Sequence, residues 1–262
     1  MMKRASPPPG ESRGLSAVAS SLGNGNAGVV LLALTAGFVD AACYLGLSEV
    51  FTAHVTGNIA TIASAVAPPT HAVGLRIEVL VAFAIGVFSV RVSTRSVAHA
   101  DARSMRKARR RVLTVEAVWL LAFVGAWYAL GAAGTHETTR DALTLFAGGA
   151  MGAQSTLPRL PGKGPMSRGT TFMTSNYTQW AMSLTDVIGD LVKPTRGVDE
   201  DAARAARHDL AQLSLLLAAF VLGAMAGAES DMRFGLGVMA GALIPLALVA
   251  SATLVRDAAP LR

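Results

Sequence analysis

The chain has 262 residues, of which 52% are hydrophobic and only 15% charged, and its formal net charge is +6. Charged residues make up about a quarter of an ordinary soluble domain, so this composition excludes that class and indicates an integral membrane protein. The single cysteine, Cys43, excludes an intrachain disulfide, and the basic residues lie between apolar runs, so we expect the lipid bilayer and no nucleic acid as a partner.

Residues 1–27 are rich in Pro, Ser, Gly and Asn, which predicts a disordered N-terminal tail. A single membrane domain is then expected over 28–255, followed by a C-terminal tail over 256–262. About 20 helical residues cross a hydrocarbon core of roughly 30 Å. The runs that meet or approach this length are 28–47, 77–93, 112–133, 141–157, 209–228 and 234–255.

Two polar segments, 50–67 and 169–188, interrupt the apolar runs. If both crossed the bilayer, the basic loop 91–111 would lie outside, against the bias that keeps Lys and Arg in the cytoplasm. If each segment enters and leaves by one face, only Arg76, Arg140 and Arg233 of the 23 Lys and Arg lie outside. The charges therefore predict six membrane spans, two re-entrant segments and cytoplasmic N- and C-termini.

The order of these elements is the same in 28–133 and 141–255, and three spans per half would invert the second half relative to the first. A shift of 118 residues aligns the polar segments in a shared T-x-x-x-T-x-N pattern, and a shift of 115 aligns Gly37 with Gly152 and Asp40 with Ser155. The predicted fold class is therefore all-α: a polytopic membrane bundle of six transmembrane helices plus two re-entrant or broken helices in a 3+3 inverted repeat (repeat 1 over 28–133, repeat 2 over 141–255).

Three stretches resemble the YoaK-type bacterial integral membrane proteins, a domain family of unknown function. They are "GFVDAACYLGLSEVFTAHVTGN" at 37–58, "GAQSTLPRL" at 152–160 and "TTFMTSN" at 170–176. The chain departs from the family pattern at Ser155, where Asn is usual, and at Ser175, where Gly is common. The resemblance implies a multi-pass protein of the bacterial cytoplasmic (inner) membrane, and it supplies no substrate.

Polar residues at similar depth suggest one site near the bilayer midplane. Asp40 lies about 12 residues into the first run, or about 18 Å at 1.5 Å per residue, and Gln154 lies about as deep in the fourth run from the other face. Thr and Asn are favoured where helices begin, so we expect helix starts near 56–58 and 174–176. The predicted solute- or ion-binding residues are Asp40, His54, Thr56, Asn58, Gln154, Thr174 and Asn176.

The roles of the ionisable residues stay open at this stage. A carboxylate inside a membrane is costly and usually functional, so Asp40 either exchanges a proton or cation, or ties its helix to the Thr-rich backbone. His54 is either a proton relay or a hydrogen-bonded structural residue. Glu116 lies near the predicted start of the third run, where solvation at the interface is expected. Arg159 and Arg168 either attract an anion or follow the positive-inside bias.

The sequence lacks the zincin H-E-x-x-H, the G-x-S-x-G elbow and the phosphate-binding G-x-x-x-x-G-K-[ST] loop. We therefore expect no enzyme activity, no catalytic residue, no metal and no cofactor. The sequence favours a secondary transporter or permease for an unidentified small solute, with proton coupling through Asp40. A passive channel and a membrane scaffold or intramembrane enzyme stay open as alternatives. Small-residue pairs permit close packing within one chain or in a homo-oligomer; they are Gly148/Gly152, Gly223/Gly227 and Gly237/Gly241.

Overall fold

The computed structural model describes residues 22, 25–64, 71–95, 102–130, 137–160, 168–192 and 200–258, and these contain helices and no strand. The predicted all-α class is therefore confirmed for the described part of the chain. Most of the tail predicted to be disordered, 1–27, lies outside the described residues, although 26 and 27 already belong to the first helix. At the other end, helix continues to Ala258, three residues into the predicted tail.

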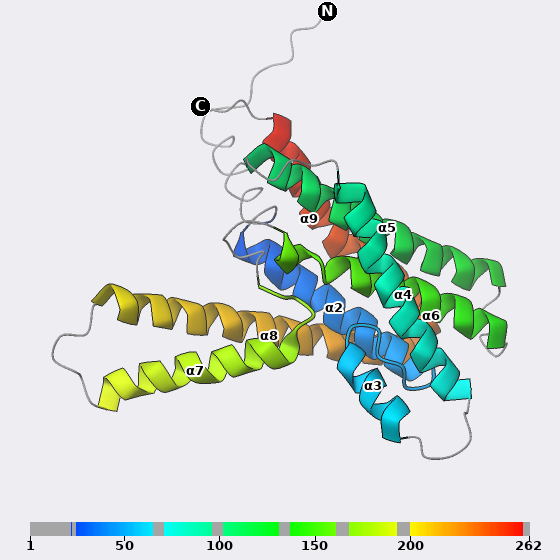
Figure 1. The fold of residues 1–262 in the computed structure, drawn as a ribbon, viewed down its shortest axis with the longest axis horizontal. Helices are drawn as coiled ribbons and strands as arrows, with labels where there is room; N and C mark the ends of the chain where they lie inside the picture. The colour runs from blue at the N-terminus through cyan, green and yellow to red at the C-terminus, as the bar shows by residue number, and fades with distance from the viewer. Residues whose placement is uncertain are drawn as a thin grey trace, which may run out of the picture.

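Figure 1 shows the described helices. Their bounds are α2 Asn26–Gly46, α3 Val55–Ser64, α4 His71–Thr94, α5 Ala102–Leu130, α6 Glu137–Gln154, the single 3-10 turn η1 Leu157–Arg159, α7 Met173–Val192, α8 Glu200–Phe234, the 3-10 helix η3 Gly235–Ala242 and α9 Leu243–Ala258. The chain turns between α8 and η3 at Gly235, whose φ of 68° lies in the left-handed region that glycine adopts without strain.

Four described stretches are long and apolar enough to cross a membrane: Asn26–Gly46, Val73–Thr94, Arg103–Leu130 and Ala203–Thr253. The last of them contains the turn at Gly235. The fourth predicted span, 141–157, corresponds to α6 and is not among these stretches, because the first turns of α6 carry Glu137, Arg140 and Asp141. The chain is thus a helical membrane protein, with large apolar side chains such as Phe88, Leu222 and Ile244 exposed where lipid would cover them.

Two helix pairs pack backbone against backbone at glycines. In the pair of α2 and α8, a Cβ on Gly37 would collide with the carbonyl oxygen of Phe220, and a Cβ on Gly223 with that of Leu34. In the pair of α4 and α6, Gly152 lies in the same way against the carbonyl of Phe83, and Gly86 against that of Gly149. Small residues allow this approach. Along α2 and α8 the contact of Leu34 with Gly223 is followed by that of Phe38 with Gly227, and along α4 and α6 the contact of Val79 with Gly148 is followed by that of Phe83 with Gly152, so each pair is parallel.

Contacts between helix ends show how the two polar segments run. Arg76, near the start of α4, donates a hydrogen bond to the carbonyl of Glu49, just after the end of α2 (3.3 Å). The chain therefore leaves α2 and enters α4 at the same end of the bundle. Residues 168–192 likewise stay beside the early part of α8, where Arg168 pairs with Asp209 at 2.5 Å. Helix α7 and the first half of α8 form an arm that projects from the bundle (Figure 1).

Candidate functional site

The chain turns back toward the bundle immediately after α2. Ser48 and Glu49 both have a left-handed φ, 61° and 59°, which costs a non-glycine residue roughly 1–2 kcal/mol. The ring of Phe51 then packs on Tyr44, with centroids 4.5 Å apart. This reversal carries residues 51–54, the first return loop, back along the last turns of α2.

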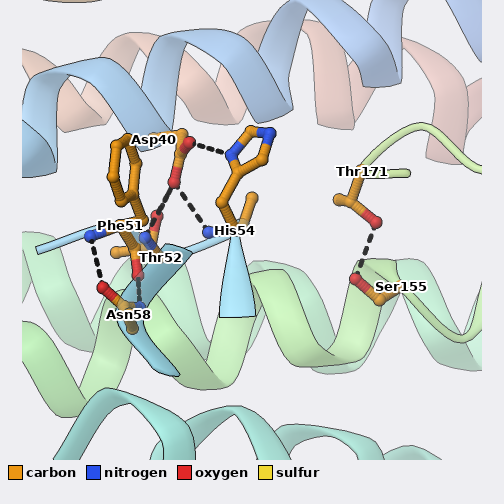
Figure 2. A network of polar contacts seen from close by, with 8 residues as sticks. Asp40, Phe51, Thr52, His54, Asn58, Ser155 and Thr171 are labelled. Carbon is orange, nitrogen blue, oxygen red and sulfur yellow. Dashed lines mark hydrogen bonds and ion pairs between the residues drawn. The ribbon is translucent and has the colours of Figure 1, made fainter. Parts of the chain in front are cut away.

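Asp40 receives this loop on the buried face of α2, where its residue is only 4% exposed. Its Oδ1 accepts hydrogen bonds from the backbone N–H groups of Thr52 and Ala53, both at 2.7 Å, and from the Thr52 hydroxyl at 3.2 Å. Figure 2 shows these contacts converging on one carboxylate. Two backbone amides and one hydroxyl hold this oxygen, so Asp40 anchors the loop against α2, the structural role that the sequence left open beside proton or cation exchange.

His54 contacts the second carboxylate oxygen of Asp40. Its Nδ1 lies 2.5 Å from Asp40 Oδ2, and its side chain is 29% exposed although that of Asp40 is almost fully buried. The imidazole lies between two aromatic rings, Phe51 at 5.7 Å and Phe220 of α8 at 5.6 Å. The pair therefore joins a buried acid to a group that is open on one side, an arrangement suited to passing a proton.

Asn58 does not cap a helix, as its position in the sequence suggests it would. Helix α3 begins at Val55, so Asn58 lies inside it, and its side chain reaches back to the first return loop. Its amide donates to the carbonyl of Phe51 at 2.5 Å, and its oxygen accepts from the N–H of Phe51 at 3.1 Å. Thr56 is exposed and is not brought to Asp40. Asn58 thus fixes the return loop against α3.

A second return loop, 168–172, precedes α7 and has a similar frame with different chemistry. Asn176 donates to the carbonyl of Gly169 at 2.6 Å, as Asn58 does to Phe51. The loop meets the end of α6 through the hydroxyls of Ser155 and Thr171, which lie 2.8 Å apart (Figure 2). No carboxylate takes part in this contact, and Thr174, like Thr56, is exposed.

Gln154 belongs to neither loop. It is fully buried, and its amide donates to the carbonyl of Leu32 at 2.8 Å. Leu32 lies eight residues before Asp40 on α2, about 12 Å along the helix axis at 1.5 Å per residue. The structure therefore brings Asp40, His54 and Asn58 together, places Asn176 at the second loop, and does not gather all seven predicted residues around one point.

A polar cavity of 590 Å³ opens beside the second return loop, between α7 and α8. Polar side chains at helical spacing on α7 line it, among them Asn176, Gln179 and Ser183, and the Arg168–Asp209 ion pair closes one side. Asp40 and His54 are not among its lining residues. The size is within the range of roughly 300–1,000 Å³ that small-molecule sites occupy.

One buried acid was placed incorrectly from the sequence. Glu116 was expected at the membrane interface, but α5 begins at Ala102, about ten residues earlier than predicted, and Glu116 is 0% exposed. Both of its carboxylate oxygens lack a hydrogen-bond partner among the described residues. The basic run 103–111 hid this helical extension, because its charge lowers the hydropathy of a segment that is nevertheless helical.

The fold and these loops define a class: a multi-helix membrane protein whose polar segments fold back against its apolar helices. The chain matches the family model described as "Protein of unknown function (DUF1275)" over residues 28–255, and it therefore belongs to that family. This confirms the resemblance to the YoaK-type membrane proteins, which are members of the same family. No curated protein and no solved structure matches the chain.

Proposed function

We propose that the chain is a secondary transporter for a small solute, built as a 3+3 inverted repeat of six membrane spans and two re-entrant segments. The observation that carries the proposal is the pair of return loops, each of which folds back against a membrane helix and then begins a new helix there. Helices interrupted in this way are typical of transporters, in which irregular backbone inside the membrane lines a binding site.

Matching contacts support the repeat. The start of α3 at Val55 and of α7 at Met173 differ by 118 residues, as do the two asparagines that fix the loops. The contact of Gly37 with Phe220 has its counterpart in that of Gly152 with Phe83. Helices α2 and α4 of the first half pack on α8 and α6 of the second half. Such reciprocal pairing is expected when two intertwined halves are related by a two-fold axis.

The positions of the helix ends support the six-span order. Gly46, the last residue of α2, lies near Leu236 of η3. Gly235, directly after α8, lies near Trp127 in the last turn of α5. This places the ends of α2, α5 and α8 at one end of the bundle, as the six-span order requires. If residues 50–67 crossed the membrane completely, α2 and α5 would end on opposite faces. We accordingly assign α6 as a span despite its polar first turns, with cytoplasmic termini in a bacterial inner membrane.

In this proposal the two loops have different roles in transport. The polar cavity beside the second loop is the candidate solute site, because it has the volume and the hydrogen-bonding side chains that a small polar solute needs. The Asp40–His54 pair is the candidate proton site, since its histidine is partly exposed and its carboxylate is buried. A proton on His54 strengthens the closed first loop, and its loss weakens that contact, so proton exchange would favour one conformation over another. No enzyme activity is proposed.

Reconstituted vesicles test the function. Wild-type protein in proteoliposomes, supplied with a small-metabolite extract of bacteria and a pH gradient, is expected to accumulate one or a few solutes, measured by mass spectrometry of the vesicle contents. Asp40→Asn should let the same solute equilibrate across the membrane without concentrating it in response to the pH gradient. Vesicles whose contents match those of protein-free vesicles for every metabolite would reject the transport proposal.

A membrane scaffold is the second candidate, and the complete hydrogen bonding of Asp40 Oδ1 favours it. In that case Asp40 only holds the loop closed, and neither loop opens. The same vesicles separate the two functions, because a scaffold transports nothing at any pH. A passive channel would equilibrate a solute without concentrating it.

A further inference from the structure

A second cavity, of 320 Å³, lies between α4 and the segment that leads from α6 into the second return loop. Most of its wall is apolar: Phe83, Val87 and Val90 lie along α4, and Leu160 and Phe172 face them. Val87 is 36% exposed at the surface of the bundle, so this wall meets the region that lipid occupies. An apolar cavity beside lipid is suited to a hydrocarbon chain.

Two arginines line this same cavity. Arg91 lies two turns beyond Phe83 on α4, and Arg159 is the last residue of η1, with its guanidinium 5.3 Å from the ring centre of Phe172. Within the described residues neither guanidinium is paired with a carboxylate, whereas Arg168, Arg204 and Arg233 each have an acidic partner. The cavity therefore combines an apolar wall with two positive charges that no acid of the described chain neutralises.

We propose that this cavity binds an anionic membrane lipid, with the phosphate held by Arg91 and Arg159 and the start of an acyl chain along Phe83 and Val87. Guanidinium groups bind phosphate oxygens in a bidentate way, and basic pockets between membrane helices on the cytoplasmic side are suited to lipid headgroups. A free phosphate would use the arginines and leave the apolar wall uncovered, which is why the complementary ligand is a lipid. This site is independent of whether the protein transports a solute.

The location gives the lipid a structural consequence. Ser155, Thr156 and Arg159 line the cavity and connect α6 to the second return loop, and Phe172 ends that loop. A bound headgroup would join α4 to this connection through Arg91 and Arg159. Anionic lipid should therefore hold the second loop in the position seen here.

Lipid titration of the purified full-length chain in detergent tests the site, with phosphatidylglycerol, phosphatidylcholine and inorganic phosphate as probes. Bound lipid is counted by native mass spectrometry, and the melting temperature is measured in parallel. Wild type should retain phosphatidylglycerol in preference to phosphatidylcholine, and it should melt at a higher temperature with phosphatidylglycerol. Arg91→Gln and Arg159→Gln should each lower the affinity for phosphatidylglycerol by about fivefold, as expected for an arginine near an anionic headgroup.

Arg95→Gln is the matched control. Arg95 is exposed at the end of α4, one turn beyond Arg91, and it does not line the cavity, so this variant should bind as wild type does. The Arg91→Lys/Arg159→Lys double variant should keep part of the preference because it keeps both charges. The proposal fails if phosphatidylcholine is retained equally, if inorganic phosphate stabilises the protein as well as the lipid does, or if Arg95→Gln loses as much affinity as Arg91→Gln. Native mass spectrometry separates folded from unfolded molecules by their charge states, so bound lipid is counted on the folded population of each variant.

Discussion

The two return loops have similar backbones and different chemistry. In each, an asparagine three residues into the following helix ties the helix to the loop, through Asn58 to Phe51 and through Asn176 to Gly169. The loop then meets the preceding membrane helix through a carboxylate in the first case, Asp40, and through a hydroxyl in the second, Ser155. The asparagine and the position of the helix start are thus what the two loops share. The acid and its histidine partner are therefore features of the first loop that the second loop lacks.

The two loops also differ in how firmly their side-chain contacts hold them to the preceding helix. The first is held by three hydrogen bonds to Asp40 Oδ1 and by the contact of Oδ2 with His54. The second is held to α6 by one contact between hydroxyl groups. The Arg168–Asp209 ion pair also holds this loop, to α8, but a partly exposed pair contributes only about 1 kcal/mol or less. The second loop therefore opens at lower cost, and the polar cavity lies beside it. On this view the second loop is the more easily opened of the two.

Removal of the two anchors should give the largest difference. Asp40→Ala leaves the buried N–H groups of Thr52 and Ala53 without an acceptor, and each such loss costs about 1–3 kcal/mol. We expect a destabilisation of about 3–5 kcal/mol when the broken network is counted as a whole. Ser155→Ala removes one hydroxyl pair and should cost about 1 kcal/mol. Denaturant unfolding of both variants in the same detergent measures the difference.

Asp40→Asn provides the control for this pair. Its side-chain oxygen can still accept from the two backbone N–H groups, so most of the stability lost in Asp40→Ala should return. Equal losses for Asp40→Ala and Ser155→Ala would show that the two loops are held by something other than these anchors.

Next in size is the effect of filling the glycine contacts, where the two halves should respond alike. A methyl group on Gly37 or Gly152 would meet the carbonyl oxygen of a phenylalanine on the paired helix, Phe220 or Phe83. Overpacking of this kind costs about 1–3 kcal/mol, so Gly37→Ala and Gly152→Ala should lower the free energy of unfolding by similar amounts. Thermal unfolding in detergent, with far-UV circular dichroism as the readout, measures both.

Gly125 is the reference for helix propensity, because nothing lies within 4 Å of a Cβ placed there. Gly125→Ala should be neutral or stabilise the protein by up to about 1 kcal/mol, as expected for Ala in place of Gly in a helix. A loss at Gly37 without one at Gly152 would break the proposed equivalence of the two helix pairs.

How much of this arrangement the sequence predicts depends on the kind of signal. Apolar runs and the T-x-x-x-T-x-N pattern predict the all-α class and place the helix starts near 56–58 and 174–176, close to the observed starts at Val55 and Met173. The position of Asp40 in an apolar run indicates a residue with a specific partner, and the structure gives it one. These inferences rest on local features, namely hydropathy, turn residues and a charge in an apolar run.

The sequence did not show which residues of different helices contact one another. The single site predicted from depth along helices fails to assemble because equal depth does not place two residues on facing sides of their helices, as the hydrogen bond from Gln154 to Leu32 shows. Asparagine at a helix start was interpreted as a cap, yet both asparagines lie inside their helices and bond backward. The cavity shared by Arg91 and Arg159 joins α4 to a segment more than 60 residues away, and no local pattern indicates that contact.

The smallest expected difference concerns the two asparagines. Asn58 makes two hydrogen bonds with the backbone of Phe51, whereas Asn176 makes one with the carbonyl of Gly169. At about 1 kcal/mol for each bond, Asn58→Ala should cost about 2 kcal/mol and Asn176→Ala about 1 kcal/mol. The first variant should also speed hydrogen exchange at the N–H of Phe51, which loses its acceptor, and no corresponding change is expected at Gly169. Hydrogen exchange read by mass spectrometry on peptides covering 47–60 and 165–180 distinguishes the two cases. Faster exchange confined to 165–180 in Asn58→Ala would mean that the loops are coupled and that the difference between their local bonds does not govern their stability.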